Sequence, residues 1–222
     1  MNAWPQVWPQ AWPQWVAWWP WLTIAALGLF HGLNPAMGWL FAVALGLHRG
    51  QRRVVLWSLV PIALGHAVAV ALAVAAALWL GGVLPYAAFA RVAGAVLLGW
   101  AIWHVVRGHR MRPRVGMRAG MLGLACWSFL MAGMHGAGLM LVPALMPICA
   151  TPGATLLDPS GALGPAMIAL GVHTVAMLAA VCAVALVVYD RVGVAFLRTG
   201  WVNLDWIWTA ALGVCGVALL LR

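Results

Sequence analysis

The chain has 222 residues, of which 66% are hydrophobic and only 7% are charged, and its mean hydropathy is +1.00. All twelve basic residues are arginine, the three acids are Asp158, Asp190 and Asp205, and the net charge is +9. This composition excludes a water-soluble fold. It also argues against a nucleic-acid surface, because the arginines are separated by long apolar runs and do not gather on one solvated face.

The first twenty residues form a segment of their own. Residues 4–14 read WPQVWPQAWPQ and carry no charge, whereas a secretory signal begins with a basic segment. Proline at every fourth position disfavours a regular helix. We therefore predict that residues 1–20 are an extended, tryptophan-rich arm that lies in the membrane–water interface on the outer side of the membrane, where indole rings are favoured. A segment that docks a partner protein is the alternative.

Six apolar runs follow, each long enough for the roughly 20 residues that cross a bilayer as a helix. They cover residues 21–47, 54–80, 86–106, 121–147, 165–189 and 201–221. The prediction is an all-α, polytopic membrane protein with six transmembrane helices. Residues 21–106 form the first transmembrane repeat, residues 107–120 a cytoplasmic arginine-rich loop, and residues 121–222 the second repeat.

The distribution of arginine predicts the orientation, because cytoplasmic loops are enriched in basic residues. Ten of the twelve arginines fall on one side of the predicted spans, namely Arg49, Arg52, Arg53, Arg107, Arg110, Arg112, Arg114, Arg118, Arg191 and Arg198. Only Arg91 and Arg222 fall on the other side. Both termini are therefore predicted to lie outside, in a multi-pass protein of the inner (plasma) membrane.

The two halves of the sequence resemble each other. Residues 27–41, LGLFHGLNPAMGWLF, and residues 130–144, LMAGMHGAGLMLVPA, each carry His-Gly in the first span of their half. A second histidine follows 35 residues after His31 and 38 residues after His135. Since each half has three spans, the halves must have opposite polarity. Such a 3+3 inverted repeat is the architecture of many secondary transporters, whose site lies near the midplane.

Four histidines fall near the centre of the predicted bilayer, and they are our candidate metal ligands: His31, His66, His135 and His173. Ionisable side chains at this depth are costly and usually mark a site or a pathway. Neutral imidazoles that only join helices by hydrogen bonds are the alternative. Proline and glycine beside these histidines favour discontinuous helices around a midplane site.

Residues 31–37, HGLNPAM, resemble the His-Gly-Leu-Asp-Pro-Asp-His motif of NicO-type nickel and cobalt transporters, which belong with LysE-type exporters built from six helices in a 3+3 inverted repeat. The first three residues and the proline match. Asn34, Ala36 and Met37 replace the two acids and the second histidine of the motif. The resemblance implies an exporter-like transporter for a transition-metal ion or a small solute.

The replacements make the predicted site less anionic and softer, which favours copper, nickel, cobalt or zinc. Calcium and magnesium are disfavoured because the spans lack carboxylate oxygens at this depth. Asn34, Met37 and Met131 are candidate additional ligands. Arg91 and Asp205 are candidate gate or pathway residues, with interfacial snorkelling as the plainer interpretation of both.

Two other functions remain open. The same histidines could hold a redox metal in a membrane-embedded metalloenzyme, or the chain could be a structural subunit of a membrane complex. The sequence offers no catalytic residue, no phosphate-binding glycine loop and no lysine, so ATP-driven transport by this chain alone is excluded. The expected partners are the lipid bilayer, a metal ion or small solute, and a complex partner or second copy of the chain.

Overall fold

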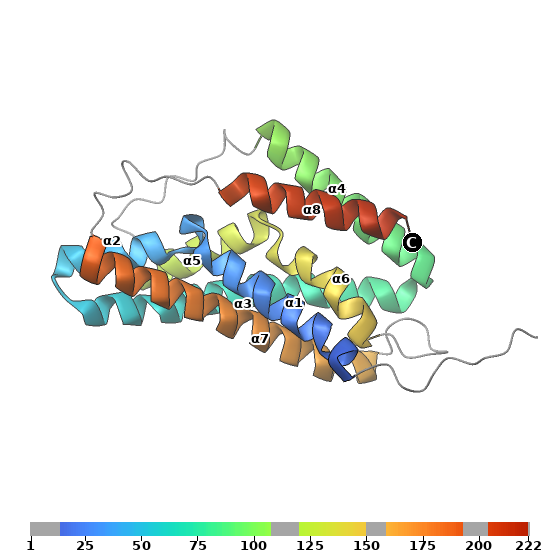
Figure 1. Ribbon diagram of the computed structural model, residues 1–222, viewed down its shortest axis with the longest axis horizontal. Helices are drawn as coiled ribbons and strands as arrows, with labels where there is room; N and C mark the ends of the chain where they lie inside the picture. The colour runs from blue at the N-terminus through green and yellow to red at the C-terminus, as the bar shows by residue number, and fades with distance from the viewer. Residues whose placement is uncertain (1–13, 108–119, 150–158, 193–203, 222) are drawn as a thin grey trace, which may run out of the picture.

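The computed structural model describes residues 14–107, 120–149, 159–192 and 204–221, and across these ranges the chain is helical without a strand. Figure 1 shows the arrangement of the helices. In chain order they are α1 (Gln14–Leu33), the short 3-10 helix η1 (Pro35–Met37), α2 (Trp39–Arg49), α3 (Arg52–Val83), α4 (Tyr86–Arg107), α5 (Met121–Met134), α6 (Ala137–Cys149), α7 (Pro159–Val187), the π-helical η2 (Val188–Val192) and α8 (Leu204–Leu220).

The helices have the length and surface of a membrane protein. Three stretches are long and apolar enough to cross a bilayer, Arg52–Val83, Tyr86–Val106 and Ala162–Arg191, and α5 with α6 makes a fourth if this bent pair is one span. Large apolar side chains lie on the outside of the bundle, as expected where the surroundings are lipid; Trp79 is 71% exposed and Leu122 is 79% exposed. The prediction of an all-α membrane protein is confirmed at this level.

The first predicted span is interrupted, in agreement with the discontinuous helices that the glycine and proline beside His31 favour. Residues 21–47 are divided among α1, η1 and α2, because Asn34 ends one helix and starts the next. Its side-chain oxygen accepts a hydrogen bond from the backbone N–H of Ala36 at 3.0 Å, and Pro35 follows at the first position of η1, where its missing N–H costs nothing. Gly38, with φ of 113°, then turns the chain into α2.

The fourth predicted span is interrupted as well. Between α5 and α6 the helix axis bends by 58°. The bend is at His135 and Gly136, and Gly136 has φ of 65°, a conformation that favours glycine. Pro143 and Pro147 lie inside α6 without ending it. The two halves of the chain therefore break their first apolar segment next to the corresponding histidine.

The amino-terminal arm is only partly described. The helix α1 begins at Gln14 and includes Pro20, so residues 14–20 are helical where we predicted an extended segment. Residues 1–13, with most of the Trp-Pro-Gln repeat, lie outside the described ranges. In Figure 1 the start of α1 and the end of α8 lie at the same end of the bundle as the α3–α4 turn, whereas the α2–α3 turn lies at the opposite end.

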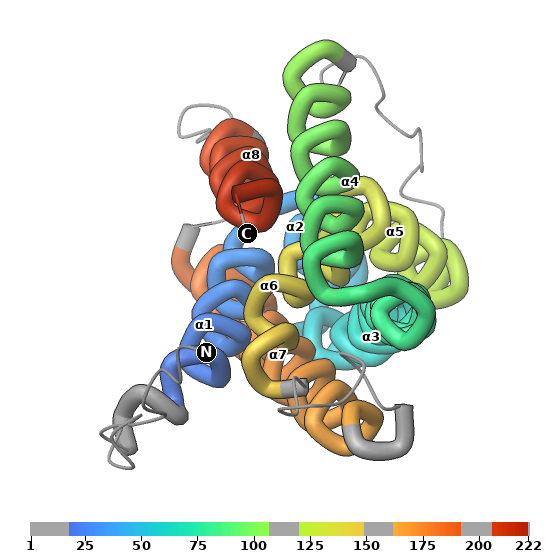
Figure 2. The backbone as a smooth tube through the Cα atoms, turned by 90° about the vertical axis from the view of Figure 1, so that its right-hand side faces the viewer, coloured from blue at the N-terminus to red at the C-terminus, as the bar shows by residue number. Residues whose placement is uncertain are grey.

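Three pairs of helices make the main contacts, and each pair joins one half of the chain to the other. The helix α1 packs on α7, α3 on α5, and α4 on α8, with α6 in contact with members of all three pairs. Figure 2 shows these pairs around α6. Glycine lets two of the pairs approach closely: a Cβ on Gly32 of α1 would clash with the carbonyl oxygen of Met177 on α7, and one on Gly94 of α4 would lie 2.8 Å from the carbonyl oxygen of Gly216 on α8.

Candidate site formed by buried imidazoles

Three of the four predicted histidines form a compact group at the centre of the bundle. His31 of α1, His66 of α3 and His173 of α7 are 1%, 0% and 0% exposed. Their ring centroids are 5.2 Å apart for His31 and His66, 5.4 Å for His66 and His173, and 6.0 Å for His31 and His173. We call these three residues the histidine trio.

The trio lies between two hydrophobic cores. On α3, Ile62 belongs to one core and Val70 to the other, and His66 lies halfway between them along the helix. On α7, Met177 and Ala169 are divided between the same two cores on either side of His173. One helical turn separates each of these two histidines from each core, so their imidazoles form a polar layer that is closed by apolar side chains at both ends.

None of the trio's ring nitrogens has a hydrogen-bond partner within the part of the chain that the structure describes. This holds for Nδ1 and Nε2 of His31, His66 and His173, all of which are buried. The His173 ring faces the backbone of Ile24, but outside hydrogen-bond geometry. A buried polar group left without a partner costs about 1–3 kcal/mol, so six such atoms in one place are unusual for packing alone.

The spacing of the trio suits a shared metal ion. Two imidazoles bound to one tetrahedral ion, with metal–nitrogen distances of about 2.0–2.1 Å, hold their ring centroids about 5 Å apart. The rings of the trio are close to that spacing. Their nitrogens do not yet converge, since across the described ranges no three His, Cys, Asp or Glu side chains are placed to hold an ion together. Binding would require the rings to turn about their side-chain bonds, with little movement of the helices.

The fourth histidine, His135, is held differently. Its ring centroid lies 6.3 Å from that of His31. Its Nδ1 donates a hydrogen bond to the carbonyl oxygen of Met131 at 2.9 Å, which leaves the lone pair on Nε2. Asn34 Nδ2 lies 3.4 Å from that Nε2 and donates to it, while Asn34 Oδ1 accepts a hydrogen bond from the backbone N–H of Ala36. The structure thus connects the helix break after α1 with the one after α5.

The remaining predicted site residues fall in different surroundings. Met37 in η1 and Met131 in α5 are buried, and Met131 accepts a hydrogen bond from His135 through its carbonyl oxygen. Arg91 is exposed on α4. Asp205 is in the first turn of α8, and its side chain lies outside what the structure describes.

Sequence analysis missed the tryptophans that hold the two helix breaks. At the first break the indole N–H of Trp39 donates to the Leu33 carbonyl at 3.1 Å, and that of Trp127 donates to the Ala36 carbonyl at 2.9 Å. These carbonyls have lost their helical partners, so an indole donor satisfies them. The only available signal was tryptophan inside apolar segments, where its N–H needs a partner.

The second break is held in the same way. Trp100 of α4 donates to the Met134 carbonyl at 2.8 Å, and Trp208 of α8 donates to the His135 carbonyl. His104 Nε2 also hydrogen-bonds to the Met134 carbonyl. In the structure its ring centroid lies 6.0 Å from that of His135.

Comparison with protein-family models, curated proteins and solved structures finds no match to this chain. The functional interpretation therefore depends on the geometry of the site.

Proposed function

We propose that this chain is a membrane transporter for a first-row transition-metal ion, which binds at the histidine trio. The observation that carries the proposal is the group of six buried ring nitrogens that have no hydrogen-bond partner among the described residues and lie between two hydrophobic cores. A neutral imidazole offers one lone pair, so an ion held by all three rings would satisfy three of these nitrogens at once.

The chemistry of the donors favours borderline metals. Imidazole nitrogen suits zinc, copper, nickel and cobalt, whereas calcium and magnesium require several oxygen ligands. Among the described side chains the one carboxylate is that of Asp190 in η2, and it pairs with Arg52 at 3.3 Å.

The arrangement of the helices supports transport. The first helix of each half packs on the second long helix of the other half, and the two last helices, α4 and α8, pack on each other. This pattern of packing between the halves is what an inverted 3+3 repeat produces, if α1 to α4 form one half and α5 to α8 the other. The two broken helices next to His31 and His135 are also typical of transporter sites at the midplane.

The resemblance of residues 31–37 to the NicO motif supports a metal substrate, but only one residue of the motif belongs to the proposed ligand set. Of the motif positions, His31 belongs to the trio, while Asn34 contacts His135. Met37 is buried in η1. The ligand set that we propose for the bound ion is therefore His31, His66 and His173.

The test is a metal flux measurement on purified protein in sealed liposomes, with Zn(II), Ni(II), Co(II) or Cu(I) added outside and an indicator inside. We expect flux of at least one ion, loss of that flux in His66→Ala, and wild-type flux in His48→Ala, a matched control because His48 is exposed on α2. A stoichiometric metal that does not exchange would indicate a metalloenzyme instead. Absence of both binding and flux for all four ions would overturn the proposal and favour an organic solute.

A further inference from the structure

The trio continues into a chain of imidazoles that reaches the surface of the bundle. From His104 the ring centroids are 6.0 Å to His135 and 6.3 Å from His135 to His31. From His31 the next steps are 5.2 Å to His66 and 6.0 Å to His173. Five histidines, from four different helices and one helix break, are therefore connected by centroid distances of 6.3 Å or less.

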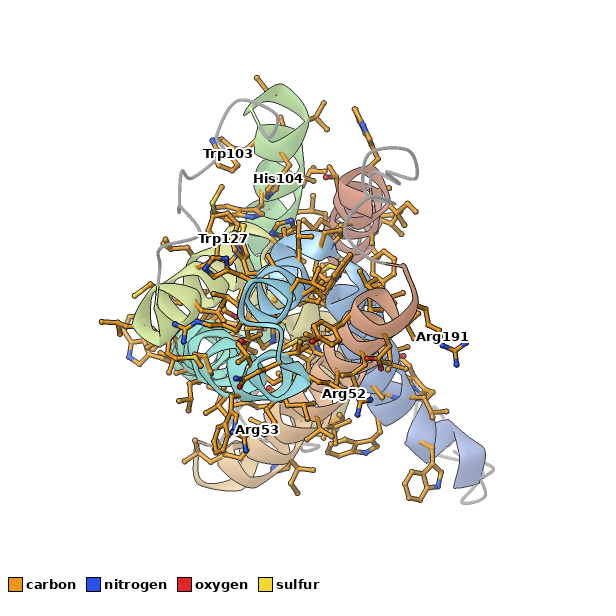
Figure 3. All side chains as sticks on the ribbon, turned by 90° about the vertical axis from the view of Figure 1, so that its left-hand side faces the viewer. Arg52, Arg53, Trp103, His104, Trp127 and Arg191 are labelled. Carbon is orange, nitrogen blue, oxygen red and sulfur yellow. The ribbon has the colours of Figure 1, made fainter. Side chains whose placement is uncertain are left out.

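Exposure decreases along this chain. His104 is partly exposed, His135 is 8% exposed and His31 is 1% exposed. His104 lies one turn before Arg107, the last residue of α4, and residues 107–118 carry five arginines in the sequence. Figure 3 looks at the bundle from the side on which Arg52, Arg53 and Arg191 are labelled, and His104 is labelled on α4 in the same view. The chain of rings thus runs from the carboxyl-terminal end of α4 toward the closed centre.

The two outer histidines are oriented as metal-binding histidines usually are. His135 donates from Nδ1 to the Met131 carbonyl, and His104 donates from Nε2 to the Met134 carbonyl. In metal sites the nitrogen that does not bind the ion commonly donates to a backbone carbonyl, which fixes the tautomer and directs the other nitrogen's lone pair. Here both carbonyls belong to the end of α5, so the helix break itself orients the pair.

The spacing permits neighbouring rings to share one ion. An ion on the line between two imidazoles, with metal–nitrogen distances of about 2.0–2.1 Å, holds the ring centroids about 6 Å apart. The steps from His104 to His135 and from His135 to His31 are 6.0 Å and 6.3 Å. An ion could therefore pass from one lone pair to the next while it keeps at least one nitrogen ligand, which avoids full desolvation in the apolar interior.

We propose that His104 and His135 form an access path that carries the transition-metal ion between the carboxyl-terminal end of α4 and the histidine trio. The proposal rests on the proposed function, since it names the route to that same site. His104 is a path residue, which touches the ion in transit, and His31, His66 and His173 are the ligands of the bound state. Asn34, which donates to His135 Nε2, must release that nitrogen for each passage.

A path residue and a ligand of the bound ion differ in how their removal changes the binding kinetics. A residue that only lowers a barrier changes the rates of loading and release by the same factor and leaves the dissociation constant unchanged. We therefore expect His104→Ala to slow both association and dissociation of Co(II) by about tenfold or more. The dissociation constant should stay within about twofold of wild type. The measurement is stopped-flow absorbance of Co(II) with the full chain in detergent, where Co(II) alone is the probe.

A second substitution separates the imidazole from its hydrogen bond. His104→Gln keeps a side-chain N–H for the Met134 carbonyl but has no imidazole nitrogen, so it should be as slow as His104→Ala. His48→Ala is the control and should bind Co(II) at the wild-type rate. If His104→Ala and His104→Gln load at the wild-type rate, or if His104→Gln alone restores it, the path is refuted. Weaker equilibrium binding in both variants would also refute it, because His104 would then be a ligand.

The failure of the proposed function would look different. His66→Ala should lose Co(II) binding at equilibrium, whatever happens to the His104 variants. If His66→Ala binds Co(II) as tightly as wild type, the trio is not the site and both proposals fail. If His66→Ala loses binding while the His104 variants load normally, the trio stands and only the path is wrong.

Discussion

His66 and His173 lie with their ring centroids 5.4 Å apart and their planes only 16° from parallel, although they belong to different halves of the chain. Each is fully buried, and no ring nitrogen of either has a hydrogen-bond partner among the described residues. Two neutral imidazoles stacked in this way gain dispersion contact but leave four polar atoms unsatisfied. The arrangement therefore stores a free-energy cost that a bound ion can remove.

Replacement of His66 by leucine should separate a ligand from a structural strut. Because His66 has no hydrogen bond to lose, His66→Leu removes two unsatisfied buried nitrogens at similar side-chain volume. We expect metal-free thermal stability equal to wild type or higher by about 1 kcal/mol or more. Wild type should gain about 2.7 kcal/mol at a metal concentration of 100 times the dissociation constant, and the variant should gain none. The measurement is thermal unfolding in detergent, followed by tryptophan fluorescence, with and without Zn(II).

The control for this experiment is His48→Leu, at an exposed position on α2, which should leave both the metal-free melting temperature and its rise with Zn(II) unchanged. A marked loss of metal-free stability in His66→Leu would contradict our interpretation. It would mean that the imidazole supports the helices in the absence of an ion.

The contact between α1 and α7 predicts a position at which even one methyl group is harmful. A Cβ on Gly32 would clash with the Met177 carbonyl oxygen and would lie 2.8 Å from the Ala180 Cβ. Backbone cannot give way as a flexible side chain can, so Gly32→Ala should destabilise the protein by about 1–3 kcal/mol. Gly171→Ala on α7 is the matched control, since its Cβ would meet nothing within 4 Å. There we expect no loss, or a gain of about 0.5–1 kcal/mol from higher helix propensity. Thermal unfolding in detergent compares the two variants, and equal stability would refute the close contact.

The sequence predicted that the apolar runs are helical, because this follows from local composition. Apolar runs must be helical in a membrane, and His31, His66 and His173 were selected as rare ionisable residues inside such runs. The structure brings these three together. The histidine separation in the two halves is similar, but similarity in sequence does not reveal that the His135 ring would be hydrogen-bonded to Asn34 and the Met131 carbonyl.

The helix breaks and their hydrogen bonds were harder to predict. Pro35 favoured an interruption and one is present, yet Pro61, Pro143 and Pro147 lie inside continuous helices. Whether proline ends a helix in an apolar environment depends on which neighbours satisfy the freed carbonyls. At the breaks those neighbours are distant in sequence; Trp127 is 91 residues from the carbonyl that it binds. A single sequence carries no record of such a pairing.

Removal of one indole donor should weaken the second break. Trp208 is 3% exposed and donates to the His135 carbonyl, so Trp208→Phe leaves that buried acceptor with one partner fewer while retaining an aromatic ring beside Phe30. We expect a loss of about 1–3 kcal/mol in thermal stability. Trp79→Phe, at a position 71% exposed, should change stability by less than about 0.5 kcal/mol. Equal melting temperatures for the two variants would show that the Trp208 hydrogen bond contributes nothing to the break.

Substitution of Asn34 by aspartate tests how His135 is oriented. A carboxylate keeps the acceptor that caps η1 through the Ala36 N–H, so the helix break should persist. It cannot donate to His135 Nε2, and it places a negative charge about where Asn34 Nδ2 now lies, 3.4 Å from that nitrogen. A cation between the new carboxylate and the imidazole would then have two ligands of the kind that nickel and zinc accept. We expect Asn34→Asp to bind Ni(II) about tenfold more tightly than wild type, equivalent to about 1.4 kcal/mol, in calorimetric titration of the detergent-purified protein.

Asn34→Ala, which loses both the cap and the donor, should gain no affinity and should lose about 1 kcal/mol of stability. Unchanged Ni(II) affinity in Asn34→Asp would mean that the His135 lone pair is not accessible to an ion, and the access path through His104 and His135 would lose its middle step.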